Sequence, residues 1–201
     1  MDVADAEGIA HEAWEGTGGL LPVDAFELAA LLGVELVAWA KPDGRCDVAR
    51  GAVWFPGGAR LVRQHGVIAH ELGHWLLHRA GEDHTQEWAA RYLAGALLLP
   101  RVPFLRDVRA TGWDLHALQA RHPNASAEMI VVRMTQVSDA CAWVWDDGAV
   151  KRRYGTASDE DVEAIVDRVL AADAPLCDGA VRAWPLLERG HRRVVVVRLA
   201  A

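Results

Sequence analysis

Residues 67–77 read Val-Ile-Ala-His-Glu-Leu-Gly-His-Trp-Leu-Leu, an apolar stretch that carries two histidines and one glutamate. Its pattern predicts a helix over residues 64–79. On that helix, His70 and His74 lie one turn apart on the same face, so both imidazoles can reach one metal ion. Glu71 points about 100° further round the helix, which keeps it beside the ion without making it a ligand. The stretch therefore predicts a zinc site that includes His70 and His74.

Glu71 is the predicted catalytic residue of this site. Zinc lowers the pKa of a bound water towards about 7, and a neighbouring carboxylate can take a proton from that water and pass it to the leaving amine. A structural zinc has no use for such a base and is usually held by four Cys or His ligands. The HExxH spacing therefore predicts a zinc-dependent peptidase, with a catalytically silent zinc-bearing interaction module as the alternative.

A hydrolytic zinc also needs a third protein ligand. His78 continues the helical series, but eight residues of helix rise about 12 Å, and bonds of about 2.1 Å cannot hold both ends of that span. We therefore expect His78 to pack near the site without binding the ion. The remaining candidates are Asp83 and His84 in the connection after the helix, and Glu87, whose helix can run back against the first.

The composition is that of a globular protein that can bury a core. Of the 201 residues, 52% are hydrophobic, which suits one generous domain or one domain with a small appendage. The formal net charge of −7 argues against a protein whose main role is to grip the nucleic-acid backbone.

The expected location is the cytoplasm, without a membrane partner. The acidic N-terminus lacks the order of a signal peptide. The longest apolar run, residues 93–99, is too short to cross a bilayer. Three cysteines without metal-type spacing fit a reducing compartment.

The elements expected around the motif helix define an α+β fold. Further helices are predicted over residues 22–32, 85–99, 113–121 and 126–136, with Ser126 as an N-cap. Strands are predicted over residues 34–39, 51–55 and 59–63, the last two joined as a hairpin by Pro56-Gly57-Gly58. Later segments predict a hairpin over residues 141–154 around Asp147-Gly148, a helix over residues 158–171 and a strand over residues 193–198.

The chain is expected to divide near residue 138. Residues 1–137 form a mostly helical, zincin-like core with a small β-sheet before the motif helix, and residues 138–201 form a small α+β region of unknown role. In that region Trp143 and Trp145 fall on one face of a strand, and Tyr154 is expected to join them across the hairpin in a small hydrophobic core.

Residues 70–78 and 87–100 resemble the ImmA/IrrE family of metallopeptidases. That family shows HELGHxLLH, followed by E-x-x-A-N-x-F-A-x-x-L-L-M-P. The chain carries the first motif, and in the second it matches the glutamate, two alanines and the closing Leu-Leu-x-Pro. It departs from the second motif at three positions, which are Arg91 for Asn, Leu93 for Phe and Leu99 for Met. Similarity at residues 22–34 and 126–134 extends the resemblance over residues 15–136.

The resemblance implies a zinc ion held by His70, His74 and Glu87, with Glu71 as the general base. It also implies a protein substrate, because members of the family often cut helix-turn-helix transcriptional repressors. The implied domain is an ImmA/IrrE-like metallopeptidase over residues 1–137.

Two parts of the reaction stay open at the level of sequence. The transition state needs a donor for its oxyanion, and His65 and Tyr92 are the nearest candidates without either being assigned. An extended peptide substrate can add along the edge of the predicted sheet at residues 51–63, because a strand edge offers backbone donors and acceptors.

A direct DNA-binding regulator is a further alternative, because residues 113–136 read as helix, short turn and helix. A recognition helix must present polar groups to base edges. The second helix, residues 127–134, is nearly all apolar with a single arginine. This composition suits a core, so direct nucleic-acid binding is not expected.

Overall fold

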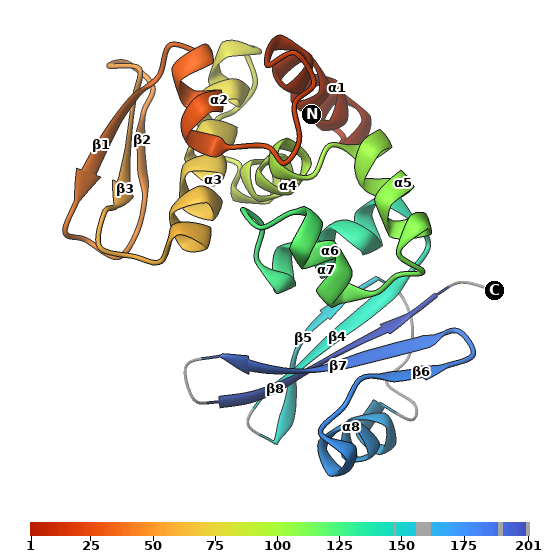
Figure 1. Ribbon diagram of the computed structural model, residues 1–201. Helices are drawn as coiled ribbons and strands as arrows, with labels where there is room; N and C mark the ends of the chain where they lie inside the picture. Colours follow the sequence, from red (N-terminus) through yellow and green to blue (C-terminus); the bar gives the residue numbers. More distant parts are fainter. Residues whose placement is uncertain (147, 156–161, 189–190, 200–201) are drawn as a thin grey trace. The chain divides into compact units, whose positions relative to one another are not determined.

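The structure, a computed structural model, describes residues 1–146, 148–155, 162–188 and 191–199 (Figure 1). It belongs to the predicted α+β class. The chain forms two compact units: the first contains residues 1–107 and 116–130, and the second residues 108–115 and 131–201. The domain boundary expected near residue 138 stays a prediction.

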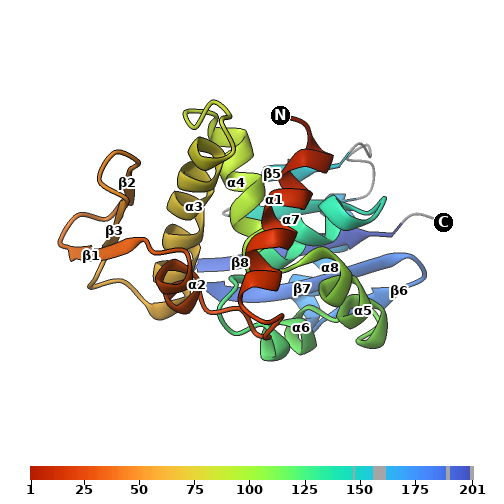
Figure 2. The same cartoon turned by 90° about the horizontal axis from the view of Figure 1, so that it is seen from above.

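The first unit is layered. Its main elements are α1 (Val3–Gly16), α2 (Ala25–Leu31), α3 (Leu61–Arg79), α4 (Glu87–Leu98) and a small sheet. The sheet packs against α3, and α4 lies between α3 and α1 (Figures 1 and 2). Further along the chain, α6 (Leu115–Arg121) and parts of α5 (Arg101–Ala110) and α7 (Ala127–Val137) complete the unit. The motif helix α3 is therefore enclosed between the sheet and α4.

The sheet of the first unit has the order β1-β3-β2. The strand β1 (Glu35–Trp39) is parallel to β3 (Ala52–Pro56), and β2 (Arg45–Asp47) is antiparallel to it. Val53 and Phe55 are buried on the face towards α3. Cys46 pairs with Val53 and so lies on this same face, since residues opposite each other in a sheet share a face. The edge strand β2 thus passes over the motif helix.

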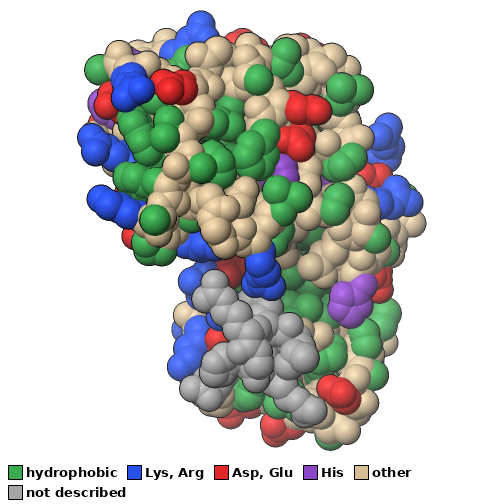
Figure 3. Space-filling model, turned by 60° about the vertical axis from the view of Figure 1, so that its left-hand side comes forward, with side chains coloured by type: hydrophobic (Ala, Val, Ile, Leu, Met, Phe, Trp, Pro, Cys, Tyr) green, Lys and Arg blue, Asp and Glu red, His purple; other side chains and the backbone are tan. Residues whose placement is uncertain are grey.

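The other face of this sheet carries aromatic and cationic side chains. The rings of Trp39 and Trp54 have centroids 6.3 Å apart. Lys41 Nζ lies 5.0 Å from the Trp39 ring, and the Arg45 guanidinium lies 5.7 Å from the Trp54 ring. Figure 3, which brings this side of the molecule forward, shows hydrophobic side chains gathered among Lys and Arg side chains. The cations thus cover aromatic surface that the sheet leaves exposed.

The strand predicted over residues 59–63, and with it the predicted hairpin, is wrong. Pro56-Gly57-Gly58 leads directly into α3, because the Arg60 carbonyl accepts hydrogen bonds from Arg63 N–H and Gln64 N–H and starts the helix. The hairpin is formed instead by β2 and β3, one strand earlier. β2 has only three residues, too few to show an alternating pattern.

Other elements of the first unit confirm the sequence pattern. α2 begins after Asp24, whose carboxylate accepts from Phe26 N–H and Glu27 N–H. α7 begins after Ser126, whose Oγ accepts from Met129 N–H at 3.2 Å. α1 and α5 were not predicted, because the buried positions of α1 are alanines with little hydrophobic contrast and α5 carries Pro103 in its first turn.

The second unit is an antiparallel sheet with a helix on one face. The strand order is β5-β4-β8-β7-β6. Its elements are β4 (Cys141–Asp146), β5 (Ala149–Tyr154), α8 (Val162–Ala172), β6 (Leu176–Asp178), β7 (Val181–Glu188) and β8 (His191–Arg198). Trp143, Val194 and Val196 pack with the apolar face of α8. The predicted hairpin and final strand are confirmed, whereas β6 and β7 were not predicted.

Tyr154 does not join Trp143, which corrects the expectation from sequence. Tyr154 pairs with Ala142, whereas Trp143 pairs with Arg153, so Tyr154 and Trp143 project from opposite faces of the sheet. Residues 158–161 of the predicted helix and Asp147 of the predicted turn lie outside the described residues. Among the described residues, no helix is both long enough and apolar enough to span a bilayer.

Candidate metal centre

The helices α3 and α4 form a hairpin whose backbones touch at a glycine. A Cβ added to Gly73 would lie 2.8 Å from the carbonyl oxygen of Ala90 and 3.1 Å from its Cα, closer than real Cβ atoms approach a backbone. In the connection, Asp83 Oδ1 accepts hydrogen bonds from Thr85 N–H and Thr85 Oγ1. This close packing brings the first turn of α4, which carries Glu87, alongside the histidines of α3.

Three of the predicted site residues converge. His70 Nε2 lies 3.2 Å from His74 Nε2 and 3.4 Å from Glu87 Oε2, and His74 Nε2 lies 3.4 Å from Glu87 Oε1. Ligands around a tetrahedral zinc with bonds of about 2.1 Å are separated by about 3.4 Å. In the part of the chain that the structure describes, this is the one cluster of three such donors. The donor set therefore fits a zinc ion.

The orientation of His74 is fixed by a backbone carbonyl. His74 Nδ1 lies 2.6 Å from the carbonyl oxygen of His84, so Nδ1 carries the proton and donates it. The lone pair of neutral His74 is then on Nε2, the atom that faces His70 and Glu87. The His84 ring packs edge-to-face on His78, with centroids 5.4 Å apart, and neither ring belongs to the donor cluster.

The electrostatics around His70 favour a metal ligand. Burial, followed by the charge of His74, lowers the pKa of His70, while the carboxylate of Glu87 opposes this shift. A lowered pKa keeps the imidazole neutral near pH 7. Neutral imidazole is the form that binds metal ions, so His70 can bind zinc without first losing a proton.

Glu71 lies beside the cluster of three donors, and its carboxylate approaches the chain at Gly44, just before β2. Its side chain is buried, with 7% exposed. A Cβ added to Gly44, just before β2, would lie 2.5 Å from Glu71 Oε1, so the glycine allows the chain to approach the carboxylate. Burial raises the pKa of Glu71, and a hydrogen bond from the Cys46 backbone is among the weaker influences that lower it. A raised pKa makes the carboxylate a stronger base.

The Cys46 thiol lies outside the cluster of three donors. Burial, together with the charges of Glu71 and Asp47, raises its pKa to about 12. Thiolates bind metals and attack electrophiles, whereas a protonated thiol does neither well. Cys46 therefore contributes its backbone to the site.

The two residues considered for the oxyanion are engaged elsewhere. His65 is buried, and its Nδ1 accepts a hydrogen bond from Ala25 N–H at 3.2 Å at the start of α2. Tyr92 Oη donates to Glu7 Oε1 on α1 at 2.5 Å. Both side chains tie neighbouring helices to the α3–α4 pair.

Sequence reasoning missed Gly44 and Cys46. The Asp43-Gly44 pair is a turn signal, but a turn does not reveal which side chain it approaches. A contact between residues 44 and 71 depends on how the sheet packs on α3, and no local pattern records it.

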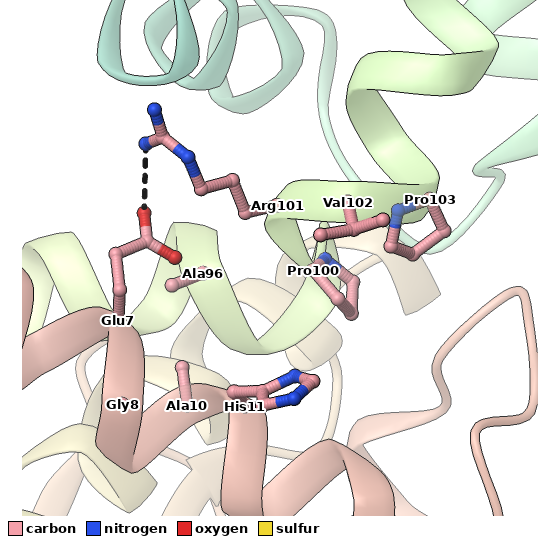
Figure 4. A pocket seen from close by; sticks show the side chains of 9 residues that line it. All are labelled: Glu7, Gly8, Ala10, His11, Ala96, Pro100, Arg101, Val102 and Pro103. Atoms are coloured by element: carbon pink, nitrogen blue, oxygen red, sulfur yellow. Dashed lines mark ion pairs between the residues drawn. The ribbon is translucent and has the colours of Figure 1, made fainter.

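A pocket of the first unit lies apart from the donor cluster (Figure 4). Glu7 and Arg101 point towards one another across it, with 3.7 Å between Glu7 Oε1 and Arg101 Nη1. The pocket lies among α1, the end of α4 and the start of α5, and apolar atoms make up most of its lining. The lining residues are Glu7, Gly8, Ala10, His11, Ala96, Pro100, Arg101, Val102 and Pro103. None of these residues belongs to the candidate metal centre.

Part of the chain is similar to a known protein family. A sequence model of a peptidase family, described as the IrrE N-terminal-like domain, matches residues 56–135, which include α3 and α4. This match confirms the resemblance carried by residues 70–100, because residues 56–135 are similar to the family of IrrE N-terminal-like domains. No curated protein matches the chain in sequence.

A solved structure of a Mycobacterium tuberculosis transcriptional regulator is similar to this chain. The likeness has a TM-score of 0.75 at 17% sequence identity and covers 98% of this chain and 76% of that chain. At this identity the likeness shows a shared fold and nothing about activity.

Proposed function

We propose that the chain is a zinc-dependent endopeptidase that cuts a regulatory protein, such as a helix-turn-helix transcriptional repressor. The observation that carries the proposal is the convergence of His70 Nε2, His74 Nε2 and the Glu87 carboxylate within 4.8 Å. Glu71 lies next to this cluster without belonging to it, as a general base requires. The peptidase family that matches residues 56–135 supports the same activity.

Each residue has one role in the proposed reaction. His70, His74 and Glu87 hold the zinc ion, and His84 fixes the tautomer of His74 through its carbonyl. When bound, zinc supplies Lewis acidity, which polarises the scissile carbonyl and acidifies the attacking water. The Glu71 carboxylate takes the proton from the water and passes it to the nitrogen of the leaving amine.

A protein substrate is proposed because members of the family cut helix-turn-helix repressors. The edge strand β2 supports an extended substrate, since it passes over α3 beside Glu71. This replaces the edge at residues 51–63 expected from the sequence, because residues 61–63 belong to α3. A substrate complex in which the peptide lies away from β2 would remove this part of the proposal.

Zinc content tests the metal centre. We expect wild type to hold one zinc ion per chain, and His74→Ala and Glu87→Gln to lose most of it. Glu12→Gln is a matched control, because Glu12 is exposed on α1 and outside the cluster. Elemental analysis after dialysis against a weak chelator measures the result. Wild-type zinc content in Glu87→Gln would remove Glu87 as a ligand.

Cleavage separates an enzyme from a silent zinc-bearing module. The zinc-loaded protein is incubated with the helix-turn-helix repressor encoded nearest to its own gene, and mass spectrometry identifies the fragments. We expect a single cut by wild type and none by Glu71→Gln, which keeps the zinc ligands. An intact repressor with both proteins would favour the silent module or another substrate.

A further inference from the structure

Arg91 is a cation one helical turn after Glu87, and the proposed reaction does not use it. It lies on α4 four residues after Glu87, so both side chains share one face of the helix. A helical side chain leans towards the helix N-terminus and covers the preceding turn. Arg91 therefore lies on the face of α4 that carries Glu87, one helical turn further along the chain.

The positive charge of Arg91 also acts on His70. After burial and the charge of His74, the charge of Arg91 is among the causes that lower the pKa of His70. Glu71 approaches the sheet at Gly44, whereas Arg91 belongs to α4 on the other side of α3. Glu71 thus approaches the sheet, whereas Arg91 lies on the helix that supplies Glu87.

Among the described residues, no partner explains the place of Arg91. A glutamate four residues before an arginine is a favourable spacing for an ion pair. However, the oxygens of Glu87 face His70 and His74, and within the described residues the Arg91 side chain makes no hydrogen bond or ion pair. The side chain is exposed. Its donors therefore remain available to a ligand that approaches the metal centre.

The chemistry of a guanidinium selects the ligand. It is charged at any physiological pH and presents a planar fork of N–H donors that matches a carboxylate with two parallel hydrogen bonds. A donor for the oxyanion works best when water is excluded, whereas Arg91 is exposed. Exposure favours recognition of a substrate carboxylate over stabilisation of the oxyanion.

We propose that Arg91 is a specificity residue that binds an acidic side chain of the peptide substrate on the α4 side of the metal centre. This inference rests on the proposed peptidase function. Arg91 stands where the family motif has asparagine. The proposal therefore assigns a role to the charge that this difference adds.

Binding of zinc-directed probes tests the proposal without turnover. The probes are the hydroxamate of succinic acid, which carries a free carboxylate, and the neutral hydroxamate of succinamide. Calorimetry with zinc-loaded protein is expected to show that wild type prefers the acidic probe by roughly 5–10-fold, as for a partly exposed charge-assisted pair. Arg91→Asn should lose this preference, and Arg91→Lys should keep part of it.

The control variant is Arg109→Asn, which removes an exposed arginine of α5 and should keep the wild-type preference. Equal zinc content in all variants establishes that the metal centre is intact. Equal affinity of wild type for the two probes, or an unchanged preference in Arg91→Asn, would overturn the proposal.

Kinetics with two peptides separate specificity from catalysis. The peptides span the cut site of the repressor and differ only in having Glu or Gln at the position closest to the cut. We expect Arg91→Asn to raise KM for the Glu peptide alone. An equal fall in kcat on both peptides would assign Arg91 to the oxyanion and contradict the proposal. If wild type cuts neither peptide but prefers the acidic probe, the peptidase function fails while recognition of a carboxylate by Arg91 stands.

Discussion

Glu71 depends on backbone that lies far from it in the sequence. The carboxylate lies beside Gly44, just before β2, and beside the backbone of Cys46 within β2. Because Gly44 has no Cβ, the chain can pass within contact distance of Glu71 and Val67. The motif supplies the proposed base, and the turn at Gly44 limits where its carboxylate can lie.

Gly44→Ala should lower activity while leaving the zinc in place. The new Cβ would lie 2.5 Å from both Glu71 Oε1 and Val67 Cγ1, so the carboxylate must move. A displacement of about 1 Å in a reacting group can cost about 100-fold, and we expect kcat to fall roughly 10–100-fold. The measurement is kcat together with zinc content. Gly58→Ala is the control, because nothing lies within 4 Å of its Cβ; wild-type kcat in Gly44→Ala would contradict the role of Gly44.

At the scale of elements, the sequence predicts what local patterns encode. α3 and α4 follow from apolar spacing, and α2 and α7 also from caps at Asp24 and Ser126. α1 and β2 lack such patterns, because one buries only alanines and the other has three residues. The histidine pair could be predicted because it lies within one helix. The place of Glu87 could not be derived from spacing alone, because it depends on how two helices pack.

Gly73→Ala should weaken both the fold and the metal centre. Its Cβ would meet the Ala90 backbone at 2.8 Å, so α4 must move away from α3 and carry Glu87 with it. Overpacking of this kind costs about 1–3 kcal/mol in the free energy of unfolding. Urea denaturation of the zinc-free protein measures this cost, and zinc affinity should fall in parallel.

Gly66→Ala on the same helix is the matched control. The nearest atom to its Cβ is Met129 Cε at 3.7 Å, an ordinary contact. Alanine favours a helix over glycine by about 1 kcal/mol, so this variant should be slightly more stable than wild type. If both variants behaved alike, close packing at Gly73 would not be what positions α4.

A buried histidine that follows α6 and contacts Asp107 of α5 makes the stability of the fold depend on pH. His122 Nε2 lies 3.1 Å from Asp107 Oδ2, its ring packs edge-to-face on Phe104, and its burial lowers its pKa from the ordinary value of 6.5. The unfolded chain therefore binds a proton at a higher pH than the folded chain. The contribution of His122 to the free energy of unfolding should therefore be constant above about pH 6.5. It should fall as the pH drops below that value.

Urea denaturation of zinc-free protein at pH 7.5, 6.5 and 5.5 measures this dependence. His65 and His70 have lowered pKa values as well, so wild type should show their combined effect. His122→Gln should reduce the loss of stability between pH 6.5 and 5.5 without abolishing it. An identical pH dependence in wild type and His122→Gln would show that His122 does not contribute.

At the scale of the whole molecule, two properties argue against DNA as a direct partner. The formal net charge is −7, and the second helix of the helix-turn-helix pattern, α7, has its apolar residues in the core. Ile130, Val131 and Met134 are fully buried, and so is Arg133, the one arginine of that helix. The sequence could predict this burial from composition, whereas the β6–β7 pairing of the second unit depends on contacts that no local pattern contains.

The folded protein should therefore bind DNA weakly and without preference for sequence. A recognition helix needs polar groups at base edges, and a DNA-binding surface needs concentrated positive charge to release counterions. Fluorescence anisotropy with a duplex from the promoter of its own operon should give a dissociation constant weaker than about 10 μM near physiological salt, with the same value for a scrambled duplex. The helix-turn-helix repressor serves as the positive control on the same duplex. Sequence-specific binding at nanomolar concentration that weakens steeply with salt would contradict this prediction, and would favour a direct regulator over a protease that acts on one.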